Sequence, residues 1–240
     1  MRARTAATRS ATVDWTSKAG DDDGMDGSAT LSNEARILWD AAQGLARTAV
    51  AVSGTKGSGR ILPPLLFFTD PARTPEPWRT AERLPEGAGV IYRHFGAADA
   101  GAVARRLKTI AVERGLVLLI GLDADLAEAV GADGVHLPER GLNQAAALRA
   151  RRPDWLLTGA IHSPDVEAEG LDAVILSPIF PAGGASAAKP ALEVEALRAV
   201  AVRRPVYALG GINAATVGAL DGSGARGIAG VDAIQSAFAG

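Results

Sequence analysis

Three histidines are the side chains of this chain best suited to moving protons near neutral pH, and they stand in three separate motifs. His94 follows Arg93, His136 lies inside GVHL, and His162 lies inside TGAIHS. Because imidazole titrates near pH 6.5, each of them is a candidate general acid or base. Three histidines also raise the question of a metal, but their spacing matches no ligand pattern, so no metal site is predicted.

The three histidines differ in what their neighbours suggest. His162 follows an apolar run and precedes Ser-Pro-Asp, so it is a candidate acid–base residue at a strand end, or alternatively a cap of the following turn. His136 has apolar neighbours on both sides, which favours a scaffold role over a place in the ligand site. His94 is predicted to be a solvent-facing loop residue.

Glycines near the end of the chain could bind phosphate through the backbone. Gly210 and Gly211 follow one apolar run, and Gly230 with Val231 ends the last one. Glycine lets backbone N–H groups approach an anion, and a following helix N-terminus adds a favourable dipole. The alternative is a simple tight turn. Asp232 argues against phosphate, because its carboxylate would compete for the same amides or serve as the helix N-cap.

The elements that must position these residues are eight short apolar runs separated by Ala- and Arg-rich stretches. Runs that are apolar throughout indicate parallel strands buried on both faces. Eight in series predict an α/β protein, a (β/α)8 TIM barrel, whose functional residues gather where the strands end. The predicted strands are 65–69, 89–93, 116–121, 134–137, 156–161, 173–177, 206–210 and 227–231. The clearest predicted helices are 99–114 and 141–152.

Three parts of the chain are distinguished by composition. Residues 1–30 are polar and include an acidic run, which predicts a disordered tail. Residues 31–60 are predicted to form one extra helix, capped by Ser32 or Asn33, and a Gly/Ser linker. Residues 61–240 are predicted to form the barrel.

Charge and composition exclude several classes of protein. A net charge of −2 over 240 residues gives no basis for binding nucleic acid, and there is no cysteine for disulfides or thiolate chemistry. No apolar run approaches the roughly 20 residues of a membrane span. These features predict a cytoplasmic protein, and a homo-oligomer is compatible with them.

Five motifs over about 65–238 together resemble one enzyme family, that of thiamine-phosphate synthase and the TenI-like thiazole tautomerases. These motifs are DLAEAVGADGVHLPE (125–139), TGAIHS (158–163), LSPIFP (176–181), YALGGIN (207–213) and GARGIAGVDAI (224–234). The resemblance implies a (β/α)8 barrel of thiamine biosynthesis. Synthases join hydroxymethylpyrimidine diphosphate to thiazole phosphate with Mg²⁺, releasing pyrophosphate; tautomerases isomerise a thiazole carboxylate phosphate by acid–base chemistry.

The chain departs from the synthase pattern at several strand ends. In the family motif Q-L-R-x-K only Arg93 remains, and Phe95 replaces the lysine expected to hold diphosphate. The family motif I-N-D-R corresponds to residues 120–123 of this chain. Asp123 lies one position after the place of the motif aspartate and is not counted as its replacement. The family stretch P-T-x-T-K corresponds to residues 181–186 of this chain, and Lys189 follows further along. Asp232 replaces the serine that usually opens the last helix of the family.

The remaining residues suit acid–base chemistry better than diphosphate chemistry. The predicted ligand is a small phosphorylated heterocycle such as thiazole phosphate, handled by a tautomerase or by a catalytically silent binder. The alternative is an active thiamine-phosphate synthase, and Mg²⁺ is expected only in that case. The predicted catalytic residue is His162, and the predicted substrate- or phosphate-binding residues are Arg93, His136, Ser177, Gly210, Gly211, Gly230 and Val231.

Overall fold

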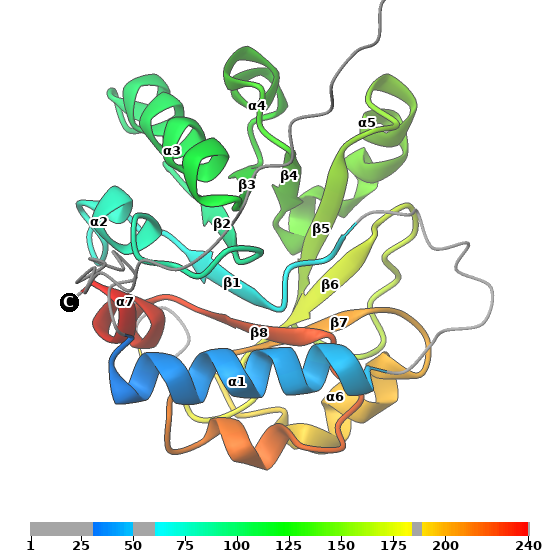
Figure 1. Cartoon of the computed structure of the whole chain (residues 1–240). Coiled ribbons are helices and arrows are strands. Elements are labelled where there is room, and N and C mark those ends of the chain that lie inside the picture. The colour runs from blue at the N-terminus through cyan, green and yellow to red at the C-terminus, as the bar shows by residue number, and fades with distance from the viewer. Residues whose placement is uncertain (1–30, 50–60, 184–188, 240) are drawn as a thin grey trace, which may run out of the picture.

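Eight parallel strands close into a barrel in the order β1 to β8 (Figure 1). The computed structural model describes residues 31–49, 61–183 and 189–239. The strands are β1 (Leu65–Phe68), β2 (Gly89–Tyr92), β3 (Val117–Gly121), β4 (Gly134–Leu137), β5 (Leu156–Ile161), β6 (Ala173–Leu176), β7 (Val206–Leu209) and β8 (Gly227–Gly230). The predicted fold class is confirmed, and every predicted strand agrees with the observed one to within one residue at each end.

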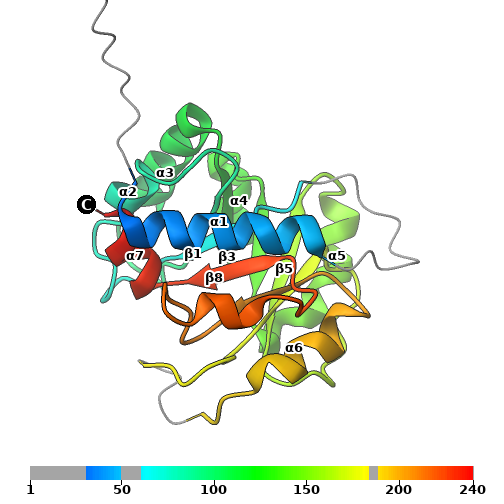
Figure 2. The same ribbon diagram turned by 60° about the horizontal axis from the view of Figure 1, so that its bottom comes forward.

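Helices surround the barrel on the outside (Figures 1 and 2). They are α1 (Asn33–Thr48), α2 (Pro77–Ala81), α3 (Ala100–Arg114), α4 (Ala124–Val130), α5 (Ala145–Arg151), α6 (Glu193–Ala201) and α7 (Asp232–Phe238), with short 3₁₀ helices η1 (Glu139–Gln144) and η3 (Val217–Leu220). The helix predicted over 141–152 therefore begins as a 3₁₀ turn. The connection from β5 to β6, residues 162–172, is fully described and contains no helix.

Alternate strand residues face the barrel interior and the helices. Phe68, Ile91 and Ile175 belong to the apolar cluster inside the barrel, whereas Phe67 and Val90 pack under the helices. Both faces are covered, so both must be apolar, which explains the unbroken hydrophobic runs. A polar side chain that points into the barrel must therefore find its hydrogen-bond partner on another residue of the barrel.

The extra helix α1 lies along β8 on the outer wall, as both ribbon views show (Figures 1 and 2). Ser32 is its N-cap: the hydroxyl oxygen accepts from the Ala35 amide at 3.0 Å and donates to the Ala237 carbonyl at 2.9 Å. Leu38 and Leu45 are buried against the barrel side. The predicted tail and linker, 1–30 and 50–60, lie outside the described residues.

The helices within residues 31–49, 61–183 and 189–239 are short or carry charged side chains. None of these helices combines the length and the apolar composition needed to cross a membrane.

Candidate functional site

A cavity of about 1600 Å³ opens at the carboxyl ends of the strands. Side chains or backbone that follow all eight strands line it, as expected for a barrel of this kind. All eight predicted site residues meet there: Arg93, His136, His162, Ser177, Gly210, Gly211, Gly230 and Val231. Sequence reasoning therefore found one contiguous surface, and the roles of its residues stay predictions.

His162 follows β5, and its exposed ring is held by one nitrogen. Nδ1 lies 2.9 Å from the Ser177 carbonyl oxygen and 3.2 Å from the Ser177 hydroxyl. Because a carbonyl only accepts, Nδ1 carries the proton and Nε2 is the basic nitrogen of the neutral ring. The His162 amide donates to the Glu139 carboxylate at 2.7 Å, which fixes the backbone as well. Nε2 has no hydrogen-bond partner within the described parts of the chain.

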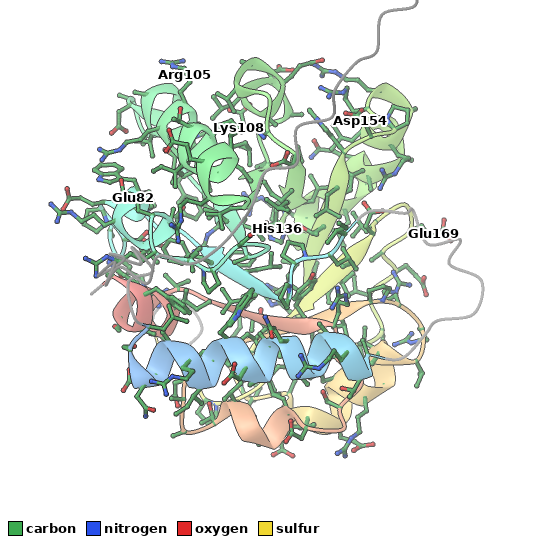
Figure 3. The ribbon with its side chains drawn as sticks, in the orientation of Figure 1. Glu82, Arg105, Lys108, His136, Asp154 and Glu169 are labelled. Atoms are coloured by element: carbon green, nitrogen blue, oxygen red, sulfur yellow. The ribbon has the colours of Figure 1, made fainter. Side chains whose placement is uncertain are left out.

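His136 points into the barrel and forms part of the cavity floor (Figure 3). It is 4% exposed, its Nδ1 lies 3.0 Å from the Thr158 hydroxyl, and its ring meets Phe68 edge-on at 5.0 Å. Burial, with a smaller contribution from the charge of Arg93, lowers the pKa of His136 to about 3. The imidazole is therefore neutral at physiological pH, which fits the scaffold role favoured from the sequence.

Arg93 follows β2 and is confined on several sides. Its Nε donates to the Thr69 carbonyl at 2.7 Å, and its guanidinium lies 5.3 Å from the Phe68 ring centroid and 5.4 Å from that of Phe95. A guanidinium nitrogen is 3.8 Å from Asp70, and burial lowers the pKa of Arg93. A side chain at position 121 would meet the Arg93 Cγ at 3.1 Å. Gly121, where the family pattern has asparagine, thus makes room for the arginine stem.

Gly210 and Gly211 follow β7 and have a structural reason to be glycine. Their φ angles are 97° and 67°, in the left-handed region that glycine adopts without strain. A Cβ at Gly210 would lie 2.8 Å from Pro178, and one at Gly211 would lie 2.6 Å from the Pro181 carbonyl. These contacts account for the Gly-Gly pair as a tight turn packed against the segment after β6, and phosphate binding at this pair stays a prediction.

The last strand ends at Gly230 and leads directly into α7. Val231 is the N-cap of this helix and supplies no side-chain hydrogen bond, so the interpretation of Asp232 as the N-cap is wrong. Asp232 is instead paired with Arg73, whose Nε donates to it at 2.8 Å. This pair and the nearby Asp70 raise the pKa of Arg73. The Asp232 carboxylate does not cap the first amides of α7, so it does not compete for them by hydrogen bonding, although its charge stays in the first turn of the helix.

Arg73 is a site residue that sequence reasoning missed. It lies in the loop after β1, where the Asp70 carboxylate accepts from the Ala72 and Arg73 amides at 3.0 and 3.2 Å. Asp70 thus closes its own loop and presents Arg73 to α7. The partner Asp232 lies 159 residues further along the chain, so no local pattern signals this contact.

His94 is not a solvent-facing residue, contrary to the sequence prediction. Its side chain is 15% exposed, its Nδ1 accepts from the Gly96 amide at 3.1 Å, and its Nε2 lies 3.3 Å from the Asp123 carboxylate. The other Asp123 oxygen accepts from the Leu126 amide and caps α4. The pair joins the loops after β2 and β3, and a contact between residues this far apart in the chain could not be found from sequence.

Two bulky apolar residues beside this pair have an uncommon backbone conformation. Phe95 has φ 46° and is 71% exposed; Leu122 has φ 64° and is 40% exposed. For such residues the left-handed region costs of order 1–3 kcal/mol each, and the surrounding structure must enforce it. The sequence showed the departure from the family lysine but not this exposure and strain.

The acidic groups of the cavity do not fit a Mg²⁺ site. Mg²⁺ needs several oxygen ligands in near-octahedral geometry. Here the acidic residues are each engaged with an arginine, a histidine or a backbone amide; these residues are Asp70, Asp123, Asp125, Glu139 and Asp232. Leu122 stands where the family pattern has its Mg²⁺-linked aspartate. Within the residues described, no three His, Asp or Glu side chains are grouped to hold a metal.

Comparison with known proteins settles the family. The family described as thiamine monophosphate synthase matches residues 67–234. The chain belongs to this family. A relative from Methanoculleus marisnigri, "Thiamine-phosphate synthase", is 34% identical over 157 residues, which cover 62% of this chain and 74% of the relative. A protein of the same name from Methanospirillum hungatei is 31% identical over 163 residues, covering 64% and 79%.

A solved structure shows the same fold. "Thiamine phosphate pyrophosphorylase" from Pyrococcus furiosus superposes with a TM-score of 0.62 at 23% identity, over 73% of this chain and 91% of that one. At this identity the likeness supports the fold of the thiamine monophosphate synthase family and nothing finer. The residues at the mouth that depart from the synthase pattern, such as Phe95 and Leu122, must therefore be interpreted from the geometry of this chain.

Proposed function

We propose that this barrel binds a small phosphorylated thiazole-like heterocycle and isomerises it by proton transfer through His162. The observation that carries the proposal is the hydrogen bond from His162 Nδ1 to the Ser177 carbonyl at 2.9 Å. It orients an exposed imidazole on the cavity wall and leaves Nε2 as the base. An isomerisation needs one group that takes a proton from one ligand atom and returns it to another.

Support for the phosphate position comes from the β7 and β8 ends of the cavity. Gly211 lines the same cavity as Gly230, and Gly230 lies just before α7, whose first N–H groups have no partner within the helix. Phosphate binds at such positions in many barrels of this architecture. Since Asp232 is engaged by Arg73, a phosphate has access to these amides, with the Arg73 cation nearby.

The ligand's charge is limited by the balance of charges in the cavity. Five basic side chains line it, Arg73, Arg93, Arg140, Arg151 and Lys189, against five acidic ones. Most of the basic groups are already paired, among them Arg73 with Asp232 and Arg151 with Asp125 and Glu128. A monophosphate needs one anion site, whereas a diphosphate with its metal needs hard ligands and free cations.

Thiamine-phosphate synthesis is the second candidate function, favoured by the names of the relatives. It requires a diphosphate and Mg²⁺ to be held at the β2–β3 side, where Phe95 and Leu122 stand. The donor set described above does not fit that ion, so we derive no step through it. Assay of the protein with both synthase substrates and Mg²⁺ decides between the two candidates.

The direct test combines binding with turnover. Calorimetric titration with thiazole phosphate is expected to show binding by both the native protein and His162→Asn. Asparagine keeps a donor near the position of Nδ1 and lacks Nε2, so isomerisation of thiazole carboxylate phosphate is expected to fall about 10²-fold or more. Binding with unchanged isomerisation in this variant would contradict the role of His162. Binding without any native turnover would instead indicate a silent binder.

A further inference from the structure

Phe95 and Leu122 form what we define as the apolar corner of the cavity mouth. They follow neighbouring strands, β2 and β3, and both line the cavity. Both are exposed and both have positive φ. A bulky residue in this conformation is rare, and such outliers gather at ligand-binding positions.

The corner is held in place by the residues next to it in sequence. His94 precedes Phe95, Asp123 follows Leu122, and their side chains meet at 3.3 Å. The Gly96 amide donates to His94 Nδ1, and the Ala97 amide donates to the His94 carbonyl at 2.9 Å. The loop after β2 is thereby closed tightly around Phe95. The contact between His94 and Asp123 joins the two loops, and the apolar side chains of Phe95 and Leu122 remain at the mouth.

The charged and titratable side chains around the apolar corner already have partners. His94 and Asp123 face each other, and the Arg93 guanidinium lies between the Phe68 and Phe95 rings with Asp70 at 3.8 Å. No free lysine or arginine is recorded at this corner among the described residues. An anionic group placed here would lose its hydration without gaining a counter-ion, whereas an uncharged ring would gain apolar contact.

Arg93 connects the apolar corner with the proposed phosphate position. It touches the Phe95 ring on one side, and on the other it shares Asp70 with Arg73, the partner of Asp232 at the start of α7. Both ends therefore belong to one continuous cavity. The cavity therefore presents a proposed phosphate position at one end and an apolar surface at the other.

We propose that the apolar corner is a specificity subsite that selects monophosphates carrying an uncharged aromatic or heteroaromatic ring, with the ring against Phe95 and Leu122. This inference rests on the proposed phosphate position at β7–β8 and adds the surface that recognises the rest of the ligand. It concerns binding alone and involves no covalent step.

The test compares two probes of equal charge, ethyl phosphate and 2-phenylethyl phosphate, by calorimetric titration. The native protein is expected to bind 2-phenylethyl phosphate about tenfold more tightly. Phe95→Asn removes the ring while asparagine tolerates positive φ, so the affinity ratio is expected to fall to about 2 while ethyl phosphate binds as before. Val112→Asn also replaces an exposed apolar side chain with asparagine, at a 70% exposed position on α3 away from the cavity, and the ratio is expected to stay at the native value.

Each result bears on the inference. A native ratio near one, or a Phe95→Asn ratio equal to the native one, overturns the apolar corner while the phosphate position stands. If neither probe binds the native protein, the proposed phosphate position has failed and the inference built on it fails with it. Circular dichroism of both variants establishes that any loss is not loss of fold.

Discussion

The two ends of the cavity mouth differ in the groups that they present: mainly backbone at the β7–β8 end and side chains at the β2–β3 end. At the β7–β8 end, the groups that face the cavity include glycines that agree with the family motifs and the start of α7, where Asp232 is the one replacement noted. At the β2–β3 end, the family pattern relies on polar side chains, and here Phe95, Gly121 and Leu122 replace them. One barrel thus carries a retained backbone surface opposite a replaced side-chain surface.

The difference follows from how each surface is encoded. A backbone site needs glycine at a few positions because neighbouring segments approach closely, as Pro178 and Pro181 do here. Changing it would break the fold. A side-chain site can be exchanged without moving the backbone, provided that the new residues are compatible with one another, as Gly121 is with the Arg93 stem. Binding chemistry can therefore change at one end while the other end is retained.

Gly211→Ala is expected to have the largest effect, because it adds a side chain where the backbone of the β7–β8 end approaches another segment closely. The new Cβ would lie 2.6 Å from the Pro181 carbonyl oxygen and 2.7 Å from the Phe180 Cβ, at a φ of 67°. We expect the free energy of unfolding to fall by about 3 kcal/mol, measured by urea denaturation, with loss of phosphate binding.

Gly218→Ala is the matched control for this substitution. Gly218 lies in η3, has ordinary φ, and a Cβ there meets nothing within 4 Å. Its free energy of unfolding should stay within about 0.5 kcal/mol of the native value. Equal effects of the two substitutions would show that the β7–β8 surface does not depend on close backbone approach.

His136→Asn tests whether the cavity floor between the two ends is kept uncharged. Because the pKa of His136 is lowered to about 3, the unfolded chain binds a proton between pH 6.5 and 3 that the folded protein does not. The free energy of unfolding should therefore fall as pH falls through this window, by about 1.4 kcal/mol per pH unit from this residue. Above pH 6.5, His136 does not change how the free energy of unfolding depends on pH.

The measurement is urea denaturation of native and variant protein at pH 6 and pH 4.5. Asparagine does not titrate, so the native protein should lose about 2 kcal/mol more than His136→Asn between these values. Other acidic groups contribute equally to both proteins and cancel in the difference. Parallel losses would mean that His136 is protonated in the folded protein, with a charged floor beside Arg93.

The barrel itself was predictable because its signals are local and repeated. Each strand is a short apolar run, and the observed bounds differ from the predicted ones by at most one residue. The rule that function gathers at the carboxyl ends then placed His162, Arg93 and Gly211 on one surface. Ser32 was likewise named as a cap of α1 because capping depends on residues only three apart.

Side-chain partners across the mouth could not be predicted, because they depend on how separate loops meet. Arg73 pairs with Asp232, which lies 159 residues further along the chain, and His94 contacts Asp123 across two adjacent loops. The prediction of an exposed His94 failed for this reason. The left-handed backbone of Phe95 was also hidden, since its cost is offset by contacts made elsewhere in the fold.

Asp232→Asn is expected to have the smallest effect and examines the charge at the β7–β8 end. Removing the carboxylate frees Arg73 and takes a negative charge away from the first turn of α7. We expect inorganic phosphate to bind about threefold more tightly at low salt, with the gain shrinking as ionic strength rises. Asp221→Asn, an exposed aspartate after η3, removes the same charge away from the cavity and should leave the affinity unchanged. A threefold gain in both variants would reflect net charge alone, whereas weaker binding in Asp232→Asn would mean that the Arg73–Asp232 pair itself shapes the phosphate position.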